Sequence, residues 1–425
     1  MPEDGFYLTC GQRWLVDNMM INPPLSRSIQ RVYLLNKVVD YFALVKSIRF
    51  TVASHPSLRL RLFRLSTGWR QYFPDQTAHI SGTEVNGIMP ERCHLQVQKI
   101  LAEEVNSVLD LTKESPVRAK IIKVNGESLL SLCVDHIAAD GMSFDLLEKT
   151  MYDYYQHLTS GAPLPLTDSD TFISYLEGES SQQSIEHDNS LYWQAHLKAA
   201  PIYINSNCKR ELVPISSFHY QIVGTTFQRL LTFCRLHRCT ILSVLVSVQL
   251  LLLFGSDGAD DIVLGIPISN RALVGEESIV GNLFIPLYIR FILIPNEPVI
   301  EFVQRIRDQI LDAMDHRQYD STSLIRFLSS EGKKKDCNFK IVLGCNLMRD
   351  DNPIIYPNSL FLDRLDLQLS QFCNIYEKSF YLVARQTGSM LDIDIKWDAA
   401  SWHVKTEDME IKFLIALRKI CGDTI

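Results

Sequence analysis

The sequence predicts an α/β protein with two domains. Apolar residues recur at helical spacing over residues 39–48, and the chain then passes the helix-stopping Pro56 into a strand whose apolar residues alternate from Leu60. Residues 116–136 predict two strands joined across an Asn-Gly turn at Asn125, which is a strong hairpin signal. A helix that feeds a strand indicates an α/β layer, and a length of 425 residues exceeds that of an ordinary single core.

The other elements follow in chain order. The first helix starts near Leu8, with Thr9 as its expected cap. Further helices are expected over residues 95–111, from Gly141 to near His157, and over residues 227–236, 241–254, 299–316 and 407–420; strands are expected over residues 260–267, 338–346, 379–388 and 390–398.

Two polar stretches rich in Ser, Gly and Pro separate the halves of the chain. They begin at Ser160 (SGAPLPLTDSD) and Glu177 (EGESSQQSIEHDNS), and the second half opens on the sequence YWQAHL. We therefore expect a first domain over residues 1–170, a linker over residues 171–190 and a second domain over residues 191–425.

Charge and hydropathy exclude several classes of protein. The net charge of −7 and the pI near 5.9 argue against a nucleic-acid partner, which requires a surplus of Lys and Arg on one face. The N-terminus has acids where a signal peptide has its basic region, and the apolar run over residues 241–254 is too short to span a bilayer. We therefore expect a cytoplasmic protein that binds neither nucleic acid nor membrane.

The ten cysteines form neither a disulfide framework nor a CxxC pair, which predicts reduced, mostly buried thiols. Cys234, His237 and Cys239 lie close together in a predicted helix, but the chain offers no second pair of ligands at zinc spacing. We expect no metal site there or elsewhere.

The stretch over residues 129–155 predicts a strand, a tight turn and a helix. Alternate apolar residues of the strand end on His136, and Asp140 and Gly141 close the turn. Gly141 would give the turn its backbone freedom, and Ser143 is the expected N-cap of a helix whose apolar spacing predicts that one face is buried.

His136 is the candidate catalytic residue of this stretch. A histidine at a strand end, beside the N–H groups of a glycine turn, is placed for proton transfer at neutral pH. A core histidine bonded to a backbone carbonyl fits the same pattern, so the local sequence leaves both interpretations open. The N–H of Gly141 is likewise a candidate oxyanion donor, or the glycine is there only for its backbone angles.

Several motifs, in order along the chain, carry a resemblance to a known family. They are Leu8-Thr9-Cys10-Gly11-Gln12-Arg13, His55 with Leu58-Arg59, Leu109-Asp110-Leu111 with Pro116-Val117-Arg118-Ala119, Asp135-His136-Ile137-Ala138-Ala139-Asp140-Gly141, Tyr192-Trp193, Asp261 through Pro267, Asn270-Arg271 and Val280-Gly281. Each motif alone is unspecific, but their joint order is not. Over nearly its full length the chain resembles the condensation domains of nonribosomal peptide synthetases, which share the fold of chloramphenicol acetyltransferase.

The resemblance implies a fold, a reaction and roles for named residues. The implied fold is a pair of chloramphenicol acetyltransferase-like lobes opened as a V, with the active site on a tunnel between them. The implied reaction transfers an acyl group from a carrier-protein phosphopantetheine thioester to an amine or hydroxyl, which forms an amide or ester. His136 matches the catalytic histidine of the family motif HHxxxDG, and Asp140 matches its structural aspartate, whose arginine partner is expected at Arg271.

The resemblance also implies the partners. The family needs no permanently bound cofactor, because the substrate arrives on phosphopantetheine. The chain leaves no room for an adenylation or carrier domain, so we expect a free-standing monomer that meets an acyl or peptidyl carrier protein in trans. The basic run Lys333 to Lys335 is expected to be a solvated loop and at most a docking patch for that acidic partner.

The chain departs from the family pattern at three positions. Asp135 stands where most members have a first histidine, and its carboxylate is expected either to orient His136 or to bond the backbone. Ile285 and Pro286 stand where the family commonly has asparagine and a small polar residue, which indicates an unusual acceptor.

Two alternatives stay open at this stage. The first keeps the fold and the pantetheine arm but takes the acyl group from soluble acyl-coenzyme A. The second is a catalytically silent, carrier-binding module, since a shared fold does not prove activity. The presence of His136, Asp140, Gly141 and Arg271 argues against the silent module. Whether His136 acts as a base or only orients the nucleophile also stays open.

Overall fold

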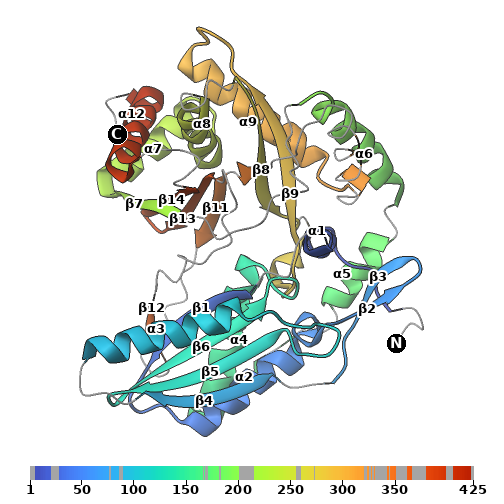
Figure 1. Ribbon diagram of the computed structural model, residues 1–425, viewed down its shortest axis with the longest axis vertical. Helices are drawn as coiled ribbons and strands as arrows, with labels where there is room; N and C mark the ends of the chain where they lie inside the picture. Colours follow the sequence, from blue (N-terminus) through green and yellow to red (C-terminus); the bar gives the residue numbers. More distant parts are fainter. Residues whose placement is uncertain are drawn as a thin grey trace. The chain divides into compact units, whose positions relative to one another are not determined.

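The computed structural model describes residues 5–20, 28–75, 78–85, 90–165, 167, 171–180, 183–200, 215–254, 260–271, 273–319, 323–324, 327, 330, 342–343, 345–350, 361–365, 380–398 and 405–422. The chain forms two compact units, each with its own sheets and helices, which confirms the α/β class (Figure 1). The first unit contains residues 1–183, 271–284 and 354–373, and the second contains residues 184–270, 285–353 and 374–425.

A five-stranded sheet forms the centre of the first unit. Its order is β12-β1-β6-β5-β4, with β12 Phe361–Leu365, β1 Ser28–Leu35, β6 Glu127–Asp135, β5 Val117–Val124 and β4 His79–Val85. Helix α3 (Pro90–Asn106) covers one face, and α2 (Tyr41–Ser54) and α4 (Gly141–Ser160) cover the other (Figure 1). The unit also contains α1 (Cys10–Met20), the 3-10 helix η1 (Pro56–Arg59), the hairpin of β2 (Arg61–Leu65) and β3 (Gly68–Tyr72), and α5 (Thr171–Ser180).

The hairpin of β5 and β6 is confirmed. The strands pair antiparallel, with Val117 opposite Val134, and the turn residues Asn125 and Gly126 have φ angles of 49° and 83°. Two successive positive φ angles are what a two-residue hairpin turn of type I′ needs, and Asn-Gly adopts them with little strain. The turn therefore fixes the register of β6, and with it the position at which the strand ends.

The core of the first unit confirms the predicted faces of β6 and α4. Leu130 and Val134 of β6 are completely buried, and they belong to one cluster with Phe144, Leu147 and Met151 of α4. Burial of a side chain of this size stabilises the folded state by about 1.5–3 kcal/mol. The start of α4 is therefore held against the end of the strand that precedes it.

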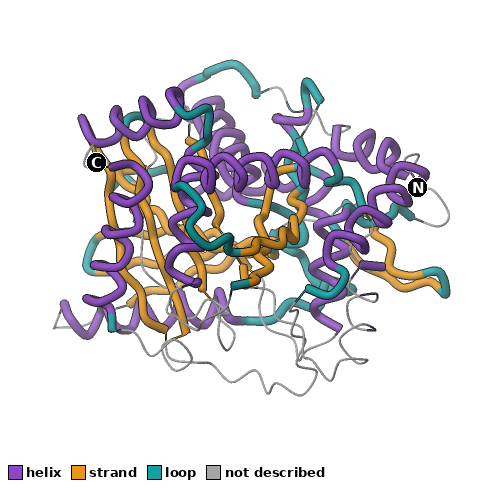
Figure 2. Tube along the Cα trace, turned by 90° about the horizontal axis from the view of Figure 1, so that it is seen from above, coloured by secondary structure: helices purple, strands orange, loops and turns teal. Residues whose placement is uncertain are grey.

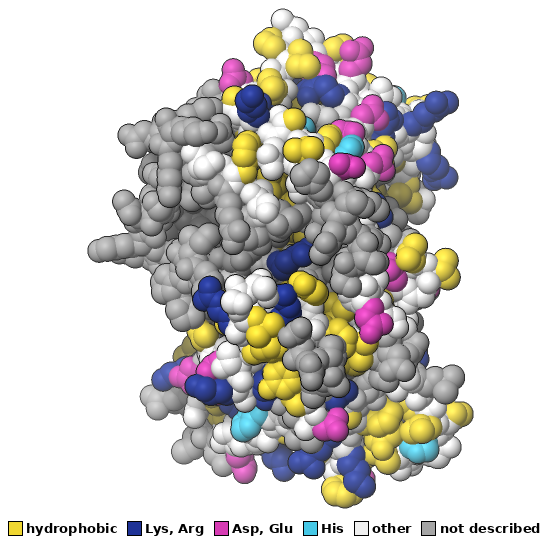
Figure 3. All heavy atoms as spheres, turned by 90° about the vertical axis from the view of Figure 1, so that its right-hand side faces the viewer, with side chains coloured by type: hydrophobic (Ala, Val, Ile, Leu, Met, Phe, Trp, Pro, Cys, Tyr) yellow, Lys and Arg dark blue, Asp and Glu magenta, His cyan; other side chains and the backbone are white. Residues whose placement is uncertain are grey.

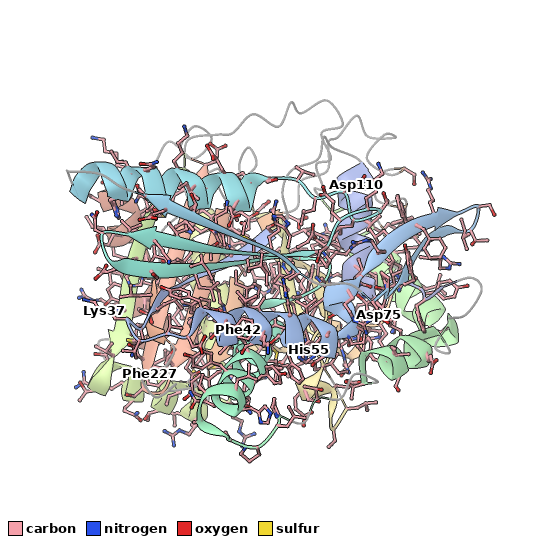
Figure 4. All side chains as sticks on the ribbon, turned by 90° about the horizontal axis from the view of Figure 1, so that it is seen from below. Lys37, Phe42, His55, Asp75, Asp110 and Phe227 are labelled. Atoms are coloured by element: carbon pink, nitrogen blue, oxygen red, sulfur yellow. The ribbon has the colours of Figure 1, made fainter. Side chains whose placement is uncertain are left out.

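His55, labelled in Figure 4, ends helix α2 and is buried against α4. Its Nε2 lies 3.2 Å from Oγ1 of Thr150, and that hydroxyl donates its own proton to the carbonyl of Leu146 at 3.0 Å. His55 Nε2 must therefore be the donor to Thr150. Burial lowers the pKa of His55 to about 4, so the ring is neutral at physiological pH.

The second unit contains two sheets and the remaining helices. The sheet orders are β11-β13-β14-β7 and β10-β8-β9. The strands are β7 Ile215–Val223, β8 Asp261–Ser269, β9 Phe284–Ile292, β10 Val342–Leu343, β11 Cys345–Asp350, β13 Phe380–Thr387 and β14 Met390–Asp398. The helices are α6 Gln183–Leu197, α7 Gly224–Leu236, α8 Ile241–Phe254, α9 Val299–Asp315 and α12 Thr406–Cys421. The 3-10 helix η2 (Glu276–Ser278) lies in the part of the chain that belongs to the first unit.

Helix α8 is the most buried helix that the sequence predicted. Twelve of its fourteen residues are buried, as its apolar sequence predicts. Figure 2 shows helices lying along the strands.

The structure differs from the expected domain boundaries. The expected linker over residues 171–190 contains α5 and the first half of α6, and Phe172 and Leu176 of α5 are buried. The other residues of this stretch are mostly polar, so the sequence did not indicate that these two side chains are buried. The segment over residues 271–284 belongs to the first unit although it lies far beyond the expected boundary at residue 170, because its residues bond to that unit.

Helix α3 also ends earlier than expected, at Asn106 rather than near Asp110. The carboxylate of Asp110 accepts the N–H of Thr112 at 3.1 Å, and its carbonyl accepts the N–H of Lys113 at 2.9 Å. These bonds form a turn that competes with the helix, as short acidic side chains commonly do. The predicted loop at Lys333 to Lys335 lies outside the described residues.

No single helix among the described residues is long and apolar enough to cross a membrane; α7 and α8 reach that length only together, with a bend of 98° between them. On the face drawn in Figure 3, the coloured Lys and Arg side chains are interspersed with Asp and Glu.

Candidate active site

Strand β6 ends at Asp135, and His136 is the first residue of the turn that follows. The N–H of Asp135 donates to the carbonyl of Pro116 at 2.8 Å, and its carbonyl accepts the N–H of Ala138 at 2.9 Å. Its buried carboxylate accepts the N–H of Ile137 at 3.1 Å. This bond to the backbone is one of the two alternatives that the sequence left open for Asp135, and it stabilises the turn that carries the histidine.

The His136 ring has a defined hydrogen-bond partner and a partly exposed surface. Its Nδ1 lies 2.9 Å from the carbonyl oxygen of Ala139. Because a carbonyl oxygen can only accept, Nδ1 carries a proton, so Nε2 is the nitrogen on which a neutral imidazole has its lone pair. The ring centroid lies 5.4 Å from that of Phe284, which in turn makes an edge contact with Trp14 at 5.5 Å. The histidine thus combines the carbonyl bond of a structural residue with an Nε2 that makes no hydrogen bond to the residues that the structure describes.

Asp140, and not Ser143, is the N-cap of helix α4. Asp140 has extended backbone angles, and its carboxylate accepts the N–H of Ser143 at 3.0 Å, while the hydroxyl of Ser143 reaches back to the N–H of Asp140 at 3.4 Å. Ser143 is therefore the third residue of a capping box. The sequence prediction was wrong by three positions, because Asp and Ser both favour the cap and both are present.

Gly141 is the first residue of α4. This position takes ordinary helical angles, so the left-handed freedom that the sequence suggested for Gly141 is not what the turn uses. Its N–H belongs to the first turn of a helix, whose N–H groups lack partners within the helix. Its role as an oxyanion donor stays a prediction.

Asp140 and Arg271 form the ion pair that the resemblance to the family implies. Arg271 Nη1 lies 2.7 Å from Oδ2, and Nη2 lies 3.1 Å from Oδ1. The side chains are only 7% and 3% exposed. Burial alone would raise the pKa of Asp140, but the charge and hydrogen bonds of Arg271, with those of Ser143 and the Leu283 N–H, lower the pKa below its ordinary value. Asp140 is therefore ionised at neutral pH.

The segment over residues 279–284 is bonded to the first unit at almost every residue. Four successive backbone carbonyls accept side-chain donors: Ile279 from Arg271 at 3.0 Å, Val280 from Ser57 at 2.8 Å, Gly281 from Ser143 at 2.8 Å and Asn282 from Thr9 at 2.7 Å. The N–H of Leu283 then donates to Asp140 at 3.1 Å. Side chains rather than a neighbouring strand satisfy this backbone, which fixes the segment beside the histidine turn.

Gly281 is required in this segment by space. A Cβ added there would lie 2.6 Å from the ring of Phe172, which is well inside van der Waals contact. Gly281 also exchanges two hydrogen bonds with the hydroxyl of Ser143, one through its carbonyl and one through its N–H at 3.1 Å. The small residue lets the segment approach both α4 and α5.

Asn282 is a site residue that the sequence did not single out. Its side-chain Nδ2 donates to the backbone carbonyl of His136 at 2.6 Å and lies 3.3 Å from His136 Nδ1. The side chain is completely buried. A signal was present, because Asn282 is the polar residue in the otherwise apolar stretch that begins at Gly281, but nothing local shows which residue it bonds.

Gln12 holds the next carbonyl of the histidine turn. Its Nε2 donates to Ile137 at 3.0 Å and to Oε1 of Gln71, also at 3.0 Å, and both glutamines are completely buried. The prediction of Thr9 as the cap of α1 is confirmed, since its hydroxyl accepts the N–H of Gln12 at 3.1 Å and its own N–H donates to Gln12 Oε1 at 2.9 Å. The capping residue of α1 thus also positions a contact of the site.

Ile285 and Pro286, where the sequence departs from the expected pattern, lie in β9. Both are buried, and the carbonyl of Pro286 accepts a hydrogen bond from Tyr319 at 2.5 Å. Among the described strands, β9 is at an edge of the order β10-β8-β9, and edge strands are where sheets tolerate a proline. The sheet therefore accommodates the proline. The unusual acceptor substrate that these two residues indicated stays a prediction.

The chain matches a known family. The family model described as Condensation domain covers residues 3–417. Cyclosporin synthetase simA of Tolypocladium inflatum is 24% identical over 255 residues, which are 57% of this chain and 2% of that protein. Nonribosomal peptide synthetase kk1B of Curvularia clavata is 28% identical over 221 residues, which are 49% of this chain and 2% of that protein. The chain thus spans a small part of the length of these relatives.

Solved structures have the same fold. The starter condensation domain of rhizomide synthetase RzmA, in complex with C8-CoA, has a TM-score of 0.76 at 16% identity and covers 99% of this chain and 95% of its own. The SgcC5 protein of Streptomyces globisporus has a TM-score of 0.73 at 15% identity and covers 98% of both chains. Identities this low establish the fold alone, which is the chloramphenicol acetyltransferase-like fold of condensation domains. The family is shown by the model that matches nearly all residues: the chain belongs to the condensation-domain family of nonribosomal peptide synthetases, which forms amide and ester bonds.

Proposed function

We propose that this chain transfers an acyl group from the phosphopantetheine thioester of a carrier protein to an amine or hydroxyl acceptor. The observation that carries the proposal is the bond from His136 Nδ1 to the carbonyl of Ala139, at 2.9 Å. It leaves Nε2 as the basic nitrogen of a partly exposed ring, in a chain whose family transfers acyl groups.

The chain's own residues supply proton transfer and position. As the acceptor nitrogen attacks the thioester carbonyl, Nε2 of His136 accepts the proton that the nitrogen loses. The carbon–sulfur bond then breaks, and the proton passes to the departing thiolate, so the products are an amide and the free phosphopantetheine thiol. General base assistance of this kind typically contributes about 10²–10⁴ in rate.

Asp140 and Arg271 act as structural residues in this proposal. Their pair joins the start of α4 to the segment that carries Asn282, and neither side chain faces solvent. Asp135 holds the turn through its bond to Ile137. Gly141 is proposed as a donor to the oxyanion, because its N–H lies in the first turn of α4.

The donor is tested by intact-protein mass spectrometry. An acyl-loaded carrier protein is mixed with this protein and an amine, and the expected result is loss of the acyl mass from the carrier with appearance of the amide. A second arm replaces the carrier by the acyl-coenzyme A of the same acyl group, because the RzmA condensation domain was solved with C8-CoA. If transfer occurs only from acyl-coenzyme A, the acyl donor is the soluble thioester and not the carrier protein.

Two further results would overturn the proposal. Transfer that persists in His136→Ala would remove the histidine from the chemistry. Binding of the carrier without transfer from either donor, across a panel of amines and alcohols, would identify a silent carrier-binding module instead.

A further inference from the structure

We propose that Asn282 is a positioning residue for the acyl transfer, because its side-chain amide fixes the backbone of His136 and so the direction in which Nε2 is presented. The inference rests on the proposed function and extends it to a residue outside the recognised motifs. It is carried by four sets of contacts.

The first is the direction of the Asn282 amide. The carbonyl of His136 only accepts hydrogen bonds, so the amide group 2.6 Å away must be Nδ2 and not Oδ1. His136 Nδ1 lies 3.3 Å from the same Nδ2, but Nδ1 already carries the proton that it donates to Ala139, so this second approach is a contact between two donors and not a hydrogen bond. A side chain with no donor, or with only acceptors, cannot make the contact to the carbonyl.

The second is the space that the amide occupies. Asn282 is completely buried, and its Oδ1 faces helix α1 at Gly11. A Cβ added to Gly11 would lie 2.2 Å from this Oδ1 and 2.4 Å from the carbonyl of Phe284. The absence of a side chain at Gly11 is therefore what allows the amide to lie flat between α1 and the histidine turn.

The third is the support of the Asn282 backbone. Its carbonyl accepts the hydroxyl of Thr9 at 2.7 Å, and the next N–H, that of Leu283, donates to Asp140 at 3.1 Å. The amide is thus attached to a backbone that is held on both sides. The Asp140–Arg271 pair is thus connected to the histidine turn through Leu283, which bonds Asp140, and Asn282, which bonds His136.

The fourth is the ring itself. The carbonyl of Ala139 selects the ring form with the proton on Nδ1, and Phe284, two residues after Asn282, packs beside the ring with centroids 5.4 Å apart. Asn282 therefore fixes the main chain of His136, while Ala139 and Phe284 limit the rotation of its side chain. Loss of the amide would remove the bond to the His136 carbonyl, and the backbone that carries the ring could then shift.

The test compares Asn282→Leu, which keeps the size but removes the amide, with Asn282→Ala. A matched control is Asn189→Leu in the second unit, where Asn189 also donates from a buried Nδ2 to a backbone carbonyl, that of Gln318, at 2.6 Å. Both leucine variants lose the same kind of bond. Only the variant at Asn282 touches the histidine.

We expect kcat of both Asn282 variants to fall by about 10–100-fold with little change in KM, as is typical when a supporting partner of a reacting group is removed. Asn189→Leu should keep kcat at any temperature at which it is folded, although its melting temperature falls. If kcat of Asn282→Leu stays within about twofold of wild type, or falls no more than that of Asn189→Leu, the positioning role is wrong.

A second readout needs no substrate. Diethyl pyrocarbonate modifies the unprotonated nitrogen of accessible imidazoles, and peptide mass spectrometry follows its rate at His136. The rate should change in the Asn282 variants and match wild type in Asn189→Leu. Equal rates in all four proteins would overturn the inference, whereas absence of acyl transfer in wild type with altered rates at His136 would overturn the proposed function alone.

Discussion

Asp140 and Arg271, 131 positions apart in the chain, form a buried ion pair with two hydrogen bonds, at 2.7 and 3.1 Å. The pair joins the N-cap of α4 to the segment over residues 271–284, which the second half of the sequence contributes to the first unit. Within the described part of the chain, the hydrogen bonds to the carboxylate come from these two elements. The ion pair therefore links the histidine turn to the segment that carries Asn282.

Removal of Arg271 should cost stability as well as activity. Arg271→Ala leaves the Asp140 carboxylate buried without its counter-charge, and we expect the free energy of unfolding to fall by about 3–5 kcal/mol. The measurement is urea unfolding followed by circular dichroism.

The pair of Arg290 with Asp261 provides the control, because its side chains are 22% and 23% exposed. Arg290→Ala should lose clearly less stability than Arg271→Ala, since solvent compensates the remaining charge. A loss of turnover in Arg271→Ala with no change in stability would instead assign Arg271 to substrate contact.

His55 should make the first unit sensitive to mild acid. Its pKa is lowered by burial to about 4 in the folded state, against an ordinary value of 6.5. Between these values the unfolded chain binds a proton that the folded chain does not, so stability falls as the pH decreases from 6.5 towards 4, by up to about 3 kcal/mol.

A comparison of wild type with His55→Gln at pH 7 and pH 5 measures this effect. The variant should lose less stability than wild type over that interval. His196, whose pKa burial also lowers, is present in both proteins and cancels in the difference. Asp140 has its pKa lowered below the ordinary 3.8, so its contribution is lost only at a more acidic pH. Parallel pH dependence of the two proteins would show that His55 is not the sensor.

Gly281→Ala should destabilise the protein through a clash with Phe172. The added Cβ lies 2.6 Å from the ring, and overpacking of this kind costs about 1–3 kcal/mol. The control is Gly178→Ala in helix α5, where an added Cβ meets nothing within 4 Å, and where alanine should raise stability by up to about 1 kcal/mol.

A second substitution tests the mechanism. Phe172→Leu in the Gly281→Ala background removes the ring that the Cβ meets, so the double variant should be more stable than the sum of the two single changes predicts. Additive losses would show that the clash is not the cause.

The strand, turn and helix around His136 could be predicted because their signals are local. Asn125 and Gly126 specify the hairpin turn, and the apolar alternation that leads to Val134 places the histidine at the strand end. The one local error, the cap at Ser143 instead of Asp140, arose because both residues favour the same position.

The contacts that hold His136 from outside its own turn could not be predicted. Asn282 and Gln12 bond the carbonyls of residues that are 146 and 125 positions away, and no periodicity or turn preference specifies such a pair. The helices over residues 171–197 were missed for a related reason. Two buried anchors, Phe172 and Leu176, order a stretch whose other residues have the composition of a linker.

The central claim, that His136 carries the proton transfer, is tested most directly by the rate of acyl transfer in His136→Ala. His157→Ala is the matched control, because His157 also bonds a backbone carbonyl through Nδ1, that of Ala162 at 2.7 Å, at the far end of α4. We predict that His136→Ala loses about 100-fold or more in kcat while keeping the wild-type circular dichroism spectrum, and that His157→Ala keeps its rate. Near-normal turnover of folded His136→Ala would contradict the account.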